Sequence, residues 1–168
     1  MFDRVVIGVD PGTAATGLAV VAGGQGGAAG VVEAATIRTE ANIPEAGRLL
    51  ELHREVAAAL REHKPEGVAV ERLLWGRNVG SAMSVARATG VVLLAAAEAG
   101  VPVFEYAPLE VKLAIAGDGS AAKSVVRRAL ARIHGVAEVP RAPDAADAVA
   151  VAVCHLHQSR ALRKVSVR

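Results

Sequence analysis

The chain has 168 residues, of which 52% are hydrophobic, and its formal net charge at pH 7 is +2. This size and apolar content exclude a disordered chain and suit one domain, which we place at residues 1–168. The sequence has no run of about 18 apolar residues and no N-terminal signal pattern, so we expect no membrane span and a cytoplasmic location. A single cysteine, Cys154, excludes an internal disulfide and a CxxC metal site.

The small net charge conceals an uneven distribution. Residues 1–119 carry 10 Lys and Arg against 14 Asp and Glu, which gives −4, whereas residues 120–168 carry 9 against 3, which gives +6. A basic C-terminal third indicates a polyanionic partner. A solvated basic surface is an equally good interpretation of charge alone.

In chain order, the first elements are three strands. Residues 4–10 form an apolar run, residues 15–22 a second, and residues 31–38 a third after a glycine-rich turn, which predicts an antiparallel meander. Residues 44–63 then carry apolar side chains at helical spacing, so we expect a helix there.

The later elements alternate between strands and helices. We expect a strand, a long helix, a strand and a short helix over residues 68–71, 78–99, 101–106 and 108–116. Ser120 is the expected N-cap of a helix that ends near Gly135, and Pro143 opens a last helix that reaches about Leu162. Helices between the third, fourth and fifth strands imply parallel crossovers, so the fold class is α/β with a mixed five-stranded sheet.

Four carboxylates are the candidate catalytic residues. Asp10 and Glu71 end buried strands, and parallel neighbouring strands bring both acids to one edge of the sheet. Asp144 and Asp147 are three residues apart in the first turn of the last helix and share a face. Four clustered carboxylates need a cation, and hard oxygen ligands fit Mg²⁺ or Mn²⁺, two of which support phosphoryl transfer.

Each acid alone also has a purely structural interpretation. Asp10 before Pro-Gly is a possible turn former, and Asp144 and Asp147 complement a helix dipole. The conjunction of two strand-end acids with a helix-start pair favours the metal site. His155 and His157 lie two residues apart and do not share a helix face, so we expect no paired metal site from them.

Longer motifs are more specific than single acids. They include Gly8-Val9-Asp10-Pro11-Gly12, Val70-Glu71, Phe104-Glu105-Tyr106, Val111-Lys112, Ser120-Ala121-Ala122-Lys123-Ser124 and Asp144-Ala145-Ala146-Asp147. On these segments the chain resembles the RuvC Holliday junction resolvases, a family with the RNase H-like nuclease fold, from about residue 4 to residue 157. The resemblance implies that Asp10, Glu71, Asp144 and Asp147 are the catalytic carboxylates and that Lys112 and Lys123 assist them.

The resemblance also implies an activity and partners. The substrate would be four-way junction DNA, cut to leave 5′-phosphate and 3′-hydroxyl ends with two Mg²⁺ ions per active site, for which Mn²⁺ substitutes. A homodimer would form through the helix at residues 78–99, although ordinary burial of that helix is the alternative. RuvA and RuvB would be the partner branch-migration proteins.

The loop after Glu71 departs from the family pattern. Family members often carry an aromatic residue three positions after this acid, whereas this chain has Leu74 followed by Trp75, its only tryptophan. Leu74 could wedge between bases and Trp75 could stack on one, or Trp75 could pack on its own domain. We expect DNA contacts from Leu74, Trp75, Arg77, Asn78, Lys112, Lys123 and Arg127.

Two other function classes remain open. Residues 8–13 also resemble the first phosphate loop of sugar kinases and actin-like ATPases, but those need a second similar domain, for which 168 residues leave no room. The other class is a non-catalytic DNA-binding module. The intact acids disfavour it, because carboxylates that face DNA repel phosphates unless metals intervene.

Overall fold

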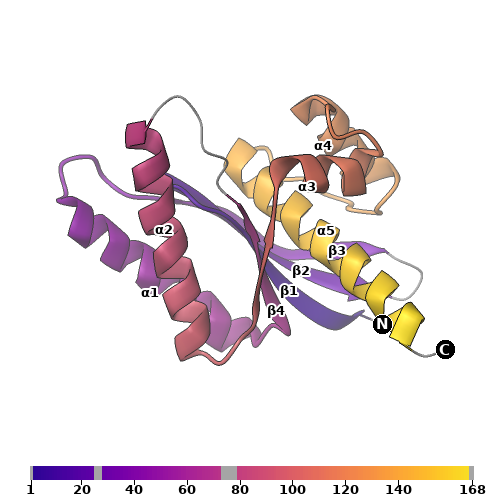
Figure 1. Cartoon of the computed structure of the whole chain (residues 1–168), viewed down its shortest axis with the longest axis horizontal. Helices are drawn as coiled ribbons and strands as arrows, with labels where there is room; N and C mark the ends of the chain where they lie inside the picture. The colour runs from indigo at the N-terminus through magenta and orange to yellow at the C-terminus, as the bar shows by residue number, and fades with distance from the viewer. Residues whose placement is uncertain (1, 25–27, 73–78, 167–168) are drawn as a thin grey trace.

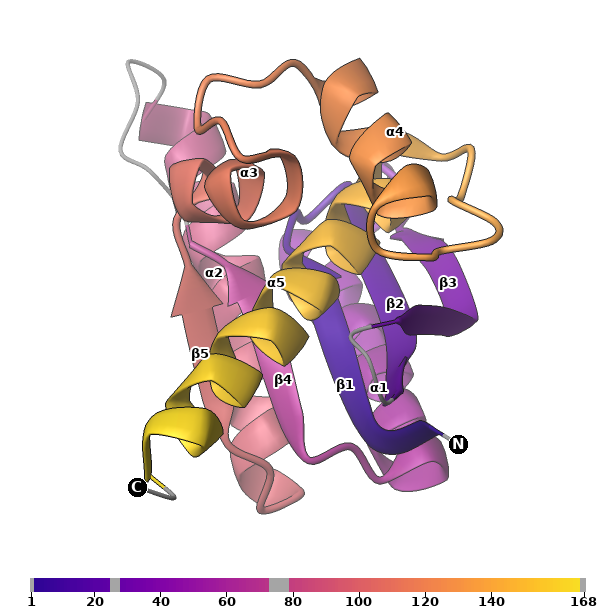
Figure 2. The same cartoon turned by 90° about the vertical axis from the view of Figure 1, so that its right-hand side faces the viewer.

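The computed structural model describes residues 2–24, 28–72 and 79–166, and the elements follow the expected order. Five strands form one sheet in the order β3-β2-β1-β4-β5, and Figure 2 labels all five of them. β1, β2 and β3 make the antiparallel meander, and β4 and β5 run parallel to β1, which confirms the mixed sheet. Their bounds are Phe2–Asp10, Ala15–Gly24, Ala29–Arg38, Gly67–Glu71 and Val103–Tyr106.

Helices cover both faces of this sheet (Figures 1 and 2). One face carries α1 (Glu45–His63) and α2 (Val79–Glu98), and the other carries α3 (Pro108–Ala116), α4 (Lys123–Arg132) and α5 (Pro143–Ser166). Strand side chains alternate between two cores, so in β1 Val6 faces α5 whereas Ile7 and Val9 face α1 and α2. Asp10 takes the same face as Val6, and it therefore points to the α5 side.

Two glycines allow α5 to lie directly on the sheet. A Cβ at Gly8 would stand 2.0 Å from the backbone oxygen of Ala148, and one at Gly17 would stand 1.9 Å from that of Asp144. Both distances are far inside van der Waals contact, so these strand positions accept no side chain. The first turns of α5 are consequently held against β1 and β2 where β1 ends.

Two expectations about helix starts are wrong. α4 begins at Lys123 with Ala122 as its N-cap, and Ser120 does not cap it. The N–H and the hydroxyl of Ser120 both donate to Oδ1 of Asp118, at 2.8 and 2.7 Å, which holds Ser120 in a turn before the helix. In α5 the first turn contains Asp144 alone, and Asp147 lies in the second.

α2 is apolar on both its inner and its outer face. It is the one helix in the described residues that is long and apolar enough to cross a membrane by length and composition. The inner residues Ala88, Val92, Ala95 and Ala96 belong to the core between α1 and the sheet. A core helix passes the same test, so the absence of a membrane span stays a prediction.

Candidate active site

A single row of residues crosses the sheet and contains both strand-end acids. Tyr106 of β5 pairs with Glu71 of β4, and Asp10 of β1 pairs with Gly17 of β2. Val9 pairs with Val70, so the next residues in these parallel strands, Asp10 and Glu71, lie side by side. Strand alternation points both acids toward α5.

The helix pair completes a cluster of four acids above this row. The carbonyl of Asp144 contacts Gly17, the sheet neighbour of Asp10, which places the start of α5 over the strand ends (Figure 2). The charges of Glu71, Asp147 and Asp144 all act on Asp10. The structure thus brings together the four carboxylates that are far apart in the sequence.

Crowding and burial change the protonation of this cluster. The pKa of Asp10 rises from 3.8 to about 7, first because of burial and then because of the neighbouring acids. Burial also raises the pKa of Glu71, with a contribution from Asp147, while a hydrogen bond with Asp10 opposes that rise. Near neutral pH the strand-end pair therefore retains a proton that two isolated acids would lose.

Two lysines supply positive charge from different helices. Lys123, the first residue of α4, donates from Nζ to Oδ2 of Asp147 at 2.5 Å, and this hydrogen bond raises the Lys123 pKa. Lys112 of α3 acts on Glu71 through its charge. Arg127 stands one helical turn after Lys123, on the same face of α4. The expected DNA contacts Leu74, Trp75, Arg77 and Asn78 lie outside the described residues.

The chemistry of this donor set fits a divalent cation. Carboxylate oxygens are the ligands that Mg²⁺ and Mn²⁺ prefer, and the raised Asp10 pKa indicates negative charge that the lysines only partly offset. In the part of the chain that the structure describes, no three His, Cys, Asp or Glu side chains form a ready ligand set for one ion. The fit therefore rests on charge and ligand type.

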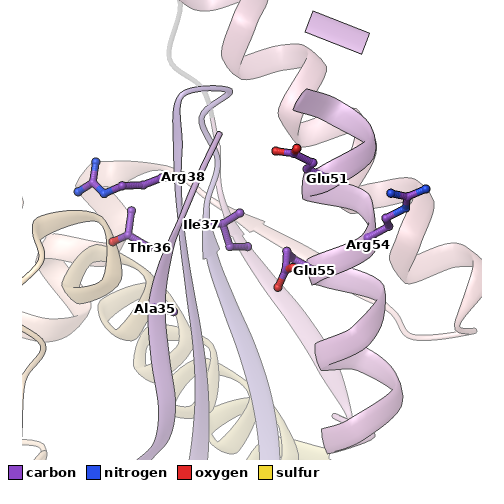
Figure 3. Close-up of a pocket in the computed structure, with 7 residues that line it drawn as sticks. All are labelled: Ala35, Thr36, Ile37, Arg38, Glu51, Arg54 and Glu55. Atoms are coloured by element: carbon purple, nitrogen blue, oxygen red, sulfur yellow. The ribbon is translucent and has the colours of Figure 1, made fainter. Parts of the chain in front are cut away.

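Other polar features of the molecule lie apart from the acids. On α5, His155 shares a 2.7 Å hydrogen bond with the hydroxyl of Tyr106, whereas His157 contacts His134, so the two histidines face different neighbours as expected. A groove of about 490 Å³ opens between β3 and α1 on the opposite face of the sheet (Figure 3). Its lining includes Ile37, Glu51 and Arg54 but none of the four acids.

The residues that sequence reasoning missed are the two glycines under α5. Gly8 and Gly17 contribute no functional group, yet they set how closely Asp144 and Asp147 approach Asp10. The sequence does contain an indication of their role, because glycine inside an apolar strand often marks the close approach of another backbone. The alanines of α5, such as Ala148, are the matching signal on the helix.

Comparison with known proteins agrees with this geometry. Residues 6–155 match the family model described as crossover junction endodeoxyribonuclease RuvC. The chain belongs to the RuvC family. A RuvC from Syntrophomonas wolfei subsp. wolfei is 44% identical over 155 residues, which cover 92% of this chain and 90% of that protein.

Solved structures support the same assignment. Thermus thermophilus RuvC in complex with a Holliday junction substrate is 40% identical, with a TM-score of 0.89 and coverage of 94% of this chain and 96% of that one. The yeast mitochondrial Holliday junction resolvase Ydc2 is 12% identical, with a TM-score of 0.68 and coverage of 95% and 80%, and shows the fold alone. The predicted family and the RNase H-like fold class are confirmed.

Proposed function

We propose that this RuvC-family chain is a structure-selective endonuclease that resolves four-way DNA junctions in a metal-dependent reaction. The observation that carries the proposal is the placement of Asp144 and Asp147 over the Asp10–Glu71 pair. A kinase-like nucleotide site is less well supported than a nuclease site built from these four acids, because residues 6–155 match the RuvC family model. A binding module without catalysis would have no use for them.

The four acids would hold Mg²⁺, with two ions per site and Mn²⁺ as a substitute. Such ions, when bound, activate water and stabilise a leaving oxygen. Asp10 and Glu71, which would be ionised when the metal is bound, would orient the attacking water, and one of the two carboxylates would accept its proton. Attack on the scissile phosphorus with departure of the 3′ oxygen leaves a 5′-phosphate and a 3′-hydroxyl.

The lysines would act on the phosphate rather than on the water. Lys123 and Lys112 place ammonium groups beside the acids, where they would stabilise charge as it develops on the phosphate. Arg127, on the same face of α4 as Lys123, would extend this contact along a DNA arm. Leu74, Trp75, Arg77 and Asn78 remain predicted DNA contacts on sequence grounds.

A homodimer would supply the two cuts that a nearly two-fold symmetric junction needs. The outer face of α2 supports this arrangement, since Val79, Met83, Leu93 and Leu94 are exposed large apolar side chains on one helix. A second copy of the chain would cover them. Assembly with RuvA and RuvB would follow from the family resemblance, and a cytoplasmic location remains a prediction from the sequence.

The test compares a synthetic four-way junction with a linear duplex of the same sequence, in Mg²⁺ and in EDTA. We expect the wild type to cut only the junction and only with metal. Asp10→Asn and Glu71→Gln should keep junction binding and lose more than about a hundredfold in cleavage rate, since changes behind the metal ligands already cost about 10- to 100-fold.

Glu105→Gln is the matched control, because Glu105 is an exposed acid on β5 that pairs with Val70 on the opposite sheet face from Glu71. It should cut normally. Cleavage at the wild-type rate by both Asp10→Asn and Glu71→Gln would refute the proposed chemistry.

A further inference from the structure

A two-way hydroxyl link holds the turn that follows Asp10. Thr13 lies in this turn, between β1 and β2, and is 6% exposed. Its Oγ1 donates to the backbone oxygen of Ser84 on α2 at 2.8 Å and accepts from the Ser84 hydroxyl at 2.5 Å. The link therefore uses the Thr13 hydroxyl both as donor and as acceptor.

A second set of hydrogen bonds holds the same turn from another side. The Thr39 hydroxyl donates to the backbone oxygen of Thr13 at 2.6 Å, and Nε of Arg48 on α1 donates to the Thr39 hydroxyl at 2.8 Å. At the start of β2, the Thr16 hydroxyl donates to the backbone oxygen of Gly12 in the turn at 2.5 Å. Both helices on the other face of the sheet are therefore linked to this turn, α2 directly through Ser84 and α1 through Thr39.

We propose that Thr13 and Ser84 are positioning residues for the cleavage reaction, because their link sets where the end of β1 holds Asp10 beside Glu71. The inference rests on the proposed function. Only Pro11 and Gly12 separate Thr13 from Asp10, so a shift of Thr13 moves the carboxylate almost directly. A displacement of about 1 Å at a reacting group can cost about a hundredfold in rate.

The helix that makes this link, α2, also carries the exposed apolar side chains. Ser84 is the chain neighbour of Met83, which belongs to the outer apolar face of that helix. The proposed dimer interface and the hydrogen bonds to the turn after Asp10 are therefore on the same helix, α2. Cleavage and dimer formation would share this structural element.

Thr13→Val tests the link, since it removes the hydroxyl and keeps the branched shape. We expect weaker Mg²⁺ binding by the DNA-free protein in calorimetry, and a Mg²⁺ concentration for half-maximal cleavage about tenfold higher. Junction affinity in EDTA should stay within about twofold of the wild type. Thr13→Ser should restore both metal measurements, which a loss of packing alone would not allow.

Two further variants keep the test decisive. Ser84→Ala removes one of the two hydrogen bonds, so it should shift Mg²⁺ binding in the same direction by less, even if Thr13→Val folds poorly. Thr89→Val is the matched control, because the Thr89 hydroxyl donates to the backbone oxygen of Val85 within α2, at 2.9 Å. It should leave Mg²⁺ binding unchanged.

Wild-type Mg²⁺ binding in both Thr13→Val and Ser84→Ala would overturn the inference, as would an equal loss in Thr89→Val. Failure of the proposed function gives a different result. In that case the wild type would leave the junction intact. The comparison of Mg²⁺ binding between the wild type and Thr13→Val would still test the link, because it is measured without DNA.

Discussion

At the scale of single residues, the ionisation of Asp10 opposes folding. Its pKa of about 7 in the folded chain lies above the ordinary value of 3.8, so between these values the folded state binds a proton that the unfolded state has lost. Stability therefore falls as the pH rises from about 4 to 7, and the full cost is present above pH 7. Below about pH 4 the cost vanishes.

Asp10→Asn should accordingly stabilise the metal-free protein at pH 8, with a gain that fades toward pH 4. Urea unfolding in EDTA at both values measures the difference in unfolding free energy. Glu105→Gln, on the other sheet face, should show no such dependence. An equal effect of Asp10→Asn at both pH values would contradict the prediction.

The sequence predicted the four acids but not the residues that place them. Asp10 and Glu71 were identifiable because a charge at the end of an apolar strand needs an explanation. Thr13 and Ser84 are 71 positions apart, and a hydroxyl in a turn or on a helix is ordinary in any sequence. Only the fold shows that they share two part-buried hydrogen bonds.

At the scale of secondary-structure elements, the contact between α5 and the sheet determines the site. Gly17→Ala should push α5 outward, since the new Cβ would meet the backbone oxygen of Asp144 and backbone cannot give way as a flexible side chain can. We expect a loss of about 1–3 kcal/mol in unfolding free energy, as in overpacked cores, together with slow cleavage. Denaturant unfolding and junction cleavage measure both.

Gly47→Ala is the control for this change. A Cβ at Gly47, in α1, would stand 2.8 Å from the γ-methyl of Ile43, which is a side chain in the loop before the helix and not backbone. Cleavage should stay normal, and alanine should suit the helix at least as well as glycine. If Gly17→Ala behaved like Gly47→Ala, close approach of α5 would not be required.

Strands and helices could be predicted where the hydrophobic periodicity is strong. The start of a helix could not be predicted where a nearby side chain takes the hydrogen bonds of the expected cap. Alternation and helical spacing predicted the strand and helix order. Ser120 failed as an N-cap because the Asp118 carboxylate, two residues earlier, takes both of its donors. Such capture is a geometric outcome that serine alone does not indicate.

At the scale of the whole molecule, the outer face of α2 makes assembly testable. Leu94 is 54% exposed, so Leu94→Glu should leave the fold intact and shift a dimer toward monomer in sedimentation. Val32→Glu, on β3 at 58% exposure, is the matched control and should not change the mass. A wild type that is monomeric at all concentrations would refute this use of α2.

The charge distribution over the chain predicts how junction binding responds to salt. The +6 charge of residues 120–168 includes Lys123, which is hydrogen-bonded to Asp147, and Arg127, which follows one turn later on the same face of α4. Because contacts to phosphate release counterions, junction affinity in EDTA should fall steeply as salt rises, and Arg127→Ala should reduce the slope. Titrations at several salt concentrations measure this slope, and a flat response would contradict a basic binding surface.

The two-residue interval between Gly8 and Asp10 limits how this sequence can change. Successive side chains of β1 point to opposite layers, so gain or loss of one residue there would turn Asp10 toward α1 and α2 and place a side chain under α5. The connection between α4 and α5 has no such alternation, and after the buried residues His134 and Val136 its last part, residues 137–142, contains no fully buried side chain. Insertions and deletions among related chains should therefore accumulate in that connection and be absent from β1.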